Sequence, residues 1–136
     1  MAKMVLLAAF VSIGGNDLSS YTRKAELTVE VEDKEVTTYA SLGWKEVLGG
    51  LKSGELSVEV LQDVAATKID SLMWPLLGTV VPFVVRLDSG AKSASNPEWT
   101  GSILVNGWNP IEGSVGDEAS VSVGYPTSGA VVRTTA

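Results

Sequence analysis

The chain has 136 residues, which predicts one domain over residues 1–136, and it contains neither cysteine nor histidine. These absences exclude a disulfide scaffold, thiolate metal sites and histidine-based catalysis. With 16 acidic and 10 basic residues, the net charge is −6, which disfavours binding to nucleic-acid phosphates or to an anionic membrane.

The N-terminal segment MAKMVLLAAFVSIGG fits two interpretations. One lysine followed by an apolar run is the outline of a secretory signal. Ser12-Ile13-Gly14 lacks the small-residue pattern of a cleavage site, however, so we expect the run to form the first β-strand. A turn should follow at Gly14, Gly15, Asn16 and Asp17.

Two alternating segments, residues 24–32 and 55–61, predict a pair of antiparallel strands. Their inward positions are apolar: Ala25, Leu27, Val29 and Val31 in the first strand, and Leu56, Val58 and Val60 in the second. Their outward positions form what we call the acidic face, which presents Glu26, Glu30, Glu55 and Glu59. Lys24 runs against this pattern, and we expect it to pair with a neighbouring carboxylate.

Between these strands lie residues 33–53, which we call the arm and in which the alternation breaks down. A loop of this length is uncommon in a compact domain and is usually functional or disordered. Disorder is disfavoured by the apolar and aromatic content of the arm. Two interpretations remain, a short helix over 43–49 packed on the core, or a loop whose apolar side chains are buried against another subunit.

Residues 63–77 predict the helix of this chain, with Asp63 as its cap, Pro75 in its last turn and Gly78 at its end. Met73 and Trp74 are expected to be core residues. The apolar run 79–87 predicts a buried strand, in which Pro82 favours an edge position or a bulge. Residues 88–98 predict an exposed, mobile loop, and 130–134 a last short strand.

The stretch from Trp99 to Pro126 predicts a hairpin-like unit. Residues 102–108 and 119–125 alternate in the strand period, and turn-forming residues crowd the space between them. On the second strand, the face that should pack inward carries Ala119, Val121, Val123 and Tyr125. Pro126 should end this strand because it cannot donate to a ladder.

Four stretches resemble, in the same order, the tail tube (major tail) proteins of long-tailed bacteriophages: VTTYASLGWKEVLGGLKSGELSVEVLQD, IDSLMWPLLG, VRLDSGAKSASNPEWTGSILV and PIEGSVGDEASVSVGYP. With the residues between them, they extend the resemblance over most of the chain, from residue 16 to 134. The resemblance implies a mainly β fold, an antiparallel sandwich or barrel with one flanking α-helix and a long interaction loop. It also implies a structural virion protein that self-assembles into stacked hexameric rings, the tail tube through which the genome is delivered.

By the same resemblance, the arm contacts ring neighbours, and its interface residues are Val36, Tyr39, Leu42, Trp44, Val47 and Leu48. Other partners would be the tape measure, tail terminator and tail tip proteins, in a virion tail assembled in the host cytoplasm without a membrane. DNA would pass through the lumen without specific binding. We expect the acidic face to line this lumen, because a cationic wall would hold the passing duplex.

We expect no enzyme activity, cofactor or metal site. The glutamates of the acidic face fit a solvated surface, since nothing in the sequence would desolvate one of them. Residues 113–117 lack the lysine and helix of a phosphate loop, and Asp117 and Glu118 lack the ligand spacing of a calcium loop. Two alternatives stay open: an inner-tube protein of a contractile injection machine, and a carbohydrate-binding module that stacks sugars on Trp44, Trp99, Trp108 and Tyr125.

Overall fold

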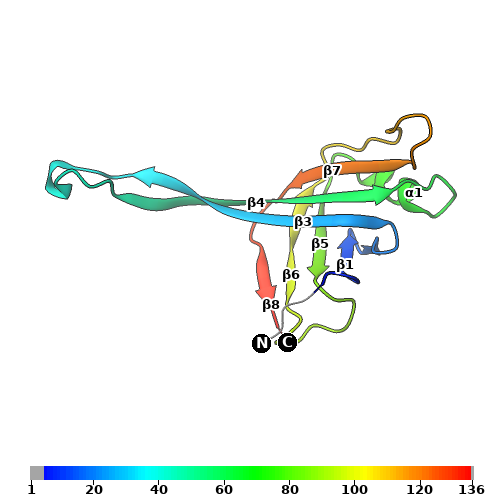
Figure 1. Cartoon of the computed structure of the whole chain (residues 1–136), viewed down its shortest axis with the longest axis horizontal. Coiled ribbons are helices and arrows are strands. Elements are labelled where there is room, and N and C mark those ends of the chain that lie inside the picture. Colours follow the sequence, from blue (N-terminus) through cyan, green and yellow to red (C-terminus); the bar gives the residue numbers. More distant parts are fainter. Residues whose placement is uncertain (1–4, 136) are drawn as a thin grey trace.

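The computed structural model describes residues 5–135, and its two antiparallel sheets pack face to face (Figure 1). The five-stranded sheet has the order β2-β1-β5-β6-β8 and consists of β1 (Phe10–Ile13), β2 (Asn16–Asp17), β5 (Val80–Arg86), β6 (Glu98–Leu104) and β8 (Val132–Thr134). The three-stranded sheet has the order β3-β4-β7 and consists of β3 (Thr22–Glu35), β4 (Val47–Leu61) and β7 (Ser120–Pro126). The predicted fold class, mainly antiparallel β with one flanking helix, is confirmed.

The apolar N-terminal run forms a strand in Phe10–Ile13, as expected, while residues 1–4 lie outside the described part of the chain. β1 turns into β2 through Gly14 and Gly15, whose φ angles are 62° and 83°. Two consecutive residues of positive φ make the tight turn that suits the twist of a hairpin, and glycine adopts them without steric cost.

The core lies between the inner faces of the two sheets. Phe83 and Ile103 contribute from the five-stranded sheet, and Leu56, Val60 and Val121 from the three-stranded sheet, each with 1% or less of its surface exposed. Two further core residues, Ile69 and Met73, come from the short helix α1 (Ile69–Met73), which closes one end of the sandwich. The inward positions predicted for β4 and β7 therefore supply much of the core.

β3 and β4 pair antiparallel as predicted, but they run on past the sandwich as a projecting hairpin (Figure 1). Both ends of the arm are strands, since β3 ends at Glu35 and β4 begins at Val47, and neither a long loop nor a helix over 43–49 forms. The predicted inward residues Val29 and Val31 are 52% and 48% exposed. That prediction was wrong because, outside the sandwich, no second sheet covers this face of the hairpin.

The helix is shorter than the predicted span of 63–77. α1 covers Ile69–Met73 and tightens into the 3₁₀ turn η2 (Trp74–Leu76), which contains Pro75. Thr67 has a φ of 65°, a left-handed conformation that interrupts any helix starting at Asp63. Trp74, predicted to lie in the core, is 57% exposed, whereas Met73 is buried.

Residues 102–108 and 119–125 do not form a hairpin. β6 pairs with β5 and β8, whereas β7 pairs with β4 in the other sheet, so the connection between them crosses the sandwich. The alternation correctly indicated strands, but it contains no information on which strand is the partner. β6 also ends at Leu104, after which Val105 and Trp108 enter the core from irregular backbone.

Pro82 lies in β5, the middle strand of its sheet, so the expected edge position or bulge was wrong. The Gly14 N–H donates to the Pro82 carbonyl at 2.7 Å, which shows that the polar backbone groups of Pro82 face the β1 side. The pairing of β1 with β5 ends at Ile13 and Phe83. The missing N–H of Pro82 therefore lies at the end of this ladder, opposite Gly14, where β1 turns into β2.

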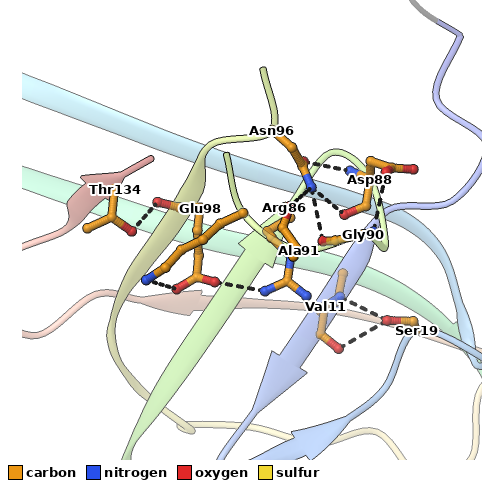
Figure 2. A network of polar contacts seen from close by, with 10 residues as sticks. Val11, Ser19, Arg86, Asp88, Gly90, Ala91, Asn96, Glu98 and Thr134 are labelled. Atoms are coloured by element: carbon orange, nitrogen blue, oxygen red, sulfur yellow. Dashed lines mark hydrogen bonds and ion pairs between the residues drawn. The ribbon is translucent and has the colours of Figure 1, made fainter. Parts of the chain in front are cut away.

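The predicted mobile loop 88–98 is tied together by the side chain of Asn96, which is 8% exposed (Figure 2). Its amide nitrogen donates to the carbonyls of Asp88, Gly90 and Ala91, and its oxygen accepts from the Asp88 N–H at 3.2 Å. Beside it, Arg86 pairs with Glu98 at 2.7 Å. A buried amide that satisfies several backbone groups fixes a loop that its polar composition alone would leave free.

Candidate assembly site

The tip of the arm is an ordered turn. The Val36 N–H donates to the Glu46 carbonyl at 2.9 Å, and the Glu46 N–H donates to the Thr37 hydroxyl at 2.9 Å. A single 3₁₀ turn, η1 (Tyr39–Ser41), fills the space between them. Leu42 and Gly43 then reverse the chain with φ angles of 53° and 87°. Hydrogen bonds of the backbone, one of them to the Thr37 hydroxyl, therefore hold the tip, although its large apolar side chains are mostly exposed.

The structure places all six predicted interface residues on the arm, and each is exposed in the single chain. Tyr39, Leu42 and Trp44 at the tip are 102%, 84% and 79% exposed. Val36, Val47 and Leu48 at the start of the paired region are 41–61% exposed. Large apolar side chains gathered on a projecting element are typical of a surface that another protein covers.

Two further exposed apolar residues of the hairpin, Val29 and Val31, were not predicted as interface residues, and Leu51, one of the apolar residues of the arm, is also exposed. Val29 and Val31 continue the apolar positions of β3 beyond the sandwich. The signal that could have found them is the length of β3. This strand is longer than the core segments Leu56–Val60 of β4 and Val121–Tyr125 of β7, so part of it must extend beyond the sandwich. Strand residues without a facing sheet must be exposed or lie against a partner.

The structure brings the four glutamates of the acidic face together on one surface. In the register of β3 with β4, Lys24, Glu26, Thr28 and Glu30 lie opposite Glu59, Ser57, Glu55 and Ser53. Cross-strand partners share a face, so all four glutamates point away from the core. Lys24 makes no ion pair with the described residues, so the pairing expected for it is not seen.

On β7 the acidic face continues as a surface of small residues. The Ser57 hydroxyl donates to the Glu55 carboxylate at 3.2 Å, and this carboxylate lies over Gly124. A Cβ on Gly124 would overlap with this carboxylate. At the start of β3, Arg23 forms ion pairs with Glu118 and with Glu59, the latter at 3.9 Å. A hydrogen bond from its own backbone N–H lowers the pKa of Glu118, as does the pairing with Arg23. The same pairing raises the pKa of Arg23.

Within residues 5–135, neither β3 nor β7 pairs with another strand along its outer edge. The Leu61 N–H donates to the Tyr21 carbonyl, and the Gly54 carbonyl accepts from the Thr127 N–H. Odd-numbered residues of β4 therefore face β3, and even-numbered ones face β7. By the two-residue period, the backbone groups of residues 25, 27, 29 and 31 point out of the β3 edge, and those of residues 120, 122 and 124 out of the β7 edge.

The aromatic residues do not form a platform for sugars. Trp108 is 7% exposed, and its indole N–H donates to Asp70 at 2.9 Å. Tyr125 is 1% exposed, and its hydroxyl donates to the Gly107 carbonyl at 2.8 Å. Burial raises the pKa of Tyr125 to about 12. With two of the four aromatics inside the domain and Trp44 on the distant arm, the stacking surface of a carbohydrate-binding module is absent from the described chain.

Among residues 5–135, the structure contains no group of three or more acidic side chains placed to hold a metal ion. The described residues also include no helix that is long and apolar enough to cross a membrane.

Comparisons with known proteins agree with this fold. A chain in the virion of a native gene transfer agent particle superimposes with a TM-score of 0.73 at 21% identity, covering 93% of this chain and 95% of that one. The fold is shared with a virion protein. A chain in the tail of an empty gene transfer agent particle, solved by helical refinement with C6 symmetry, gives a TM-score of 0.70 at 22% identity and covers 94% and 95%. No protein-family model and no curated protein sequence matches the chain.

Proposed function

We propose that this chain is a tail tube protein, which stacks in hexameric rings to form the conduit for genome delivery in a phage-like virion. The observation that carries the proposal is the projecting, apolar-tipped hairpin on a fold shared with a chain of a C6 helical tail. A single domain would then serve two purposes: the sandwich builds the ring, and the arm, residues 33–53, joins it to neighbours.

The ring interface that we propose joins the β7 edge of one subunit to the β3 edge of the next. Each edge presents N–H and C=O groups that no other strand binds within residues 5–135, and such an edge is a template for another strand. Because the two edges lie on opposite sides of the same sheet, the contact is head-to-tail, and such a contact closes into a ring when its rotation fits. Six copies would then share one continuous sheet.

The arm is proposed to lie against a neighbouring subunit through Tyr39, Leu42, Trp44 and the apolar residues beside them. These side chains are exposed in the single chain, while the backbone bonds of the tip keep them in a fixed arrangement. A preformed element pays less entropy on binding than a disordered loop. Buried aromatic side chains at the centre of an interface usually contribute most of its binding free energy.

We further propose that the acidic face lines the lumen. Four glutamates on one side of a sheet whose two edges join neighbours would become a ring of 24 carboxylates in a hexamer, if each subunit contributes the four that the register brings together. This wall repels phosphates, so the duplex does not gain the affinity that lysine or arginine contacts would add. Tape measure, tail terminator and tail tip proteins would be the other partners, in a tail assembled in the host cytoplasm.

Electron microscopy of the concentrated protein, together with sedimentation, tests the function. The expected result is rings or tubes for the intact chain, and a folded, soluble subunit that does not polymerise after replacement of residues 38–44 by a short glycine-containing turn. Tubes of normal length and yield from this variant would show that the arm is not needed for assembly. A wild-type protein that stays monomeric even with tube fragments added as seeds would contradict the function itself.

A further inference from the structure

One N–H group on the outer edge of β7 is already hydrogen-bonded within the subunit. The Ser122 N–H, which points out of this edge, donates to the Glu112 carboxylate at 3.0 Å. Glu112 belongs to the connection between β6 and β7, which folds back along the strand that it precedes. An unpaired edge N–H is what a strand from another copy would bind, so the carboxylate takes the place of a backbone carbonyl of that strand.

The loop that holds Glu112, residues 109–118, is attached by exposed contacts. Gln62 donates from its side-chain amide to the Pro110 carbonyl at 2.8 Å, and Glu118 pairs with Arg23. The backbone bond of the loop, from the Asp117 N–H to the Ser114 carbonyl, is internal to it. Ile111 and Val115 bury nothing, with 94% and 106% exposure. A segment with few buried contacts opens locally at low free-energy cost.

We propose that Glu112 is a removable cap on the β7 edge, which keeps the free subunit from pairing there and must leave before β3 of a second copy binds. This inference rests on the proposed function. The cap and the incoming strand compete for the same N–H of Ser122, so they cannot bind together. The occupant is a second copy because β3 presents a free edge of complementary hydrogen-bonding groups at residues 25, 27, 29 and 31.

The negative charge of the cap adds to the competition. A charged side chain at a strand edge discourages pairing with another chain, because the pairing would desolvate the charge. Displacement breaks the bond of Glu112, which is an exposed residue, and leaves the Ser122 N–H for the neighbour. A subunit that joins a growing tube forms the whole interface, and the free energy of these contacts would offset the loss of the Glu112 bond. Two free subunits that meet by one edge alone would not gain enough free energy to displace the cap.

The test compares Glu112→Ala with Asp117→Ala, a matched control that removes one negative charge from the same loop without touching the β7 edge. Two quantities are measured: the exchange rate of the Ser122 amide in the free subunit by NMR, and the critical concentration for tube formation by sedimentation. We expect Glu112→Ala to speed the exchange about tenfold and to lower the critical concentration by a similar factor. Glu112→Gln, which keeps an acceptor oxygen, should fall between Glu112→Ala and wild type.

The outcomes separate the two proposals. If wild type forms tubes and Glu112→Ala behaves as Asp117→Ala does, the cap is wrong while the tail tube function stands. A raised critical concentration for Glu112→Ala would also overturn the cap, since Glu112 would then be an assembly contact. If neither wild type nor any variant forms rings or tubes, there is no pairing to prevent, and both proposals fail.

Discussion

Trp44 offers the sharpest test of the arm, through Trp44→Ala. The side chain is 79% exposed in the single chain, so its removal should change the free energy of unfolding by less than about 0.5 kcal/mol. A tryptophan buries roughly 200 Å², and at about 25 cal/mol per Å² full burial of the exposed part gives a ceiling of about 4 kcal/mol per contact. Interface hot spots of this kind usually cost about 2 kcal/mol or more on truncation.

At about 1.4 kcal/mol per tenfold, a loss of 2 kcal/mol raises the critical concentration for tube formation about thirtyfold. Sedimentation at a series of concentrations measures this value, and thermal unfolding checks that the subunit stays folded. Trp74→Ala is the matched comparison, since Trp74 is 57% exposed but follows α1, at the end of the molecule opposite the arm (Figure 1). Equal critical concentrations for Trp44→Ala and wild type, with both subunits folded, would refute the reasoning.

Three other predictions concern the body of the domain. Lysine at all four glutamates of the acidic face should allow tube assembly but slow genome ejection, most strongly at low salt, and unchanged ejection kinetics would contradict the lumen assignment. Gly101→Ala should lower stability by about 1–3 kcal/mol in thermal denaturation, because its Cβ would lie 2.9 Å from the Phe83 ring and 3.1 Å from the Ala130 carbonyl. Gly107→Ala, with nothing within 4 Å of the added Cβ, is its control, and equal effects would argue against the packing explanation. Tyr125 has its pKa raised to about 12 in the folded state, so its stabilisation is present below its unfolded pKa of about 10 and is lost between about pH 10 and 12. Denaturant unfolding should show this loss of stability in the wild type and not in Tyr125→Phe. If the free energy of unfolding depends on pH in the same way in both proteins, the explanation is wrong.

The strands that have one buried face and one solvent-exposed face could be predicted from the sequence. β3 and β4 were found with their pairing, because the core imposes a two-residue period on Leu56, Val58 and Val60. The same rule explains the failure in the arm. Both faces of the projecting hairpin are exposed, so nothing selects alternating residues there, and Gly49 and Gly50 fall where the register shifts.

Features that depend on contacts between residues far apart in the sequence could not be predicted from the local pattern of apolar and polar residues. β6 and β7 each looked like half of a hairpin, yet their partners β5 and β4 are chosen by the packing of the whole sandwich. Asn96 orders its loop through three carbonyls that only the folded chain brings within reach. The helix was overestimated because apolar spacing over residues 65–76 gave no sign of the left-handed Thr67.

Those parts of the candidate site that depend on strand alternation or on exposed apolar residues were predicted from the sequence, and the others were not. The acidic face follows from strand alternation, and the structure gathers its four glutamates as expected. The six interface residues of the arm were recognised as apolar side chains without a core of their own, and they are exposed. The outer edges of the sheet and the Glu112 cap could not be predicted from the sequence. They depend on which strands lie at the sides of the sheet and on where the connection between β6 and β7 folds back.

Helical reconstruction of assembled particles by electron cryo-microscopy tests the central claim most directly. Our account predicts a tube of stacked sixfold rings, in which the sheet is continuous from β7 of one subunit to β3 of the next. Its open lumen would be lined by Glu26, Glu30, Glu55 and Glu59, and the arm would be buried against a neighbouring subunit. A tube with the acidic face on its outer wall and the arm exposed to solvent, or a protein that forms no tube at any concentration or seeding condition, would contradict the account.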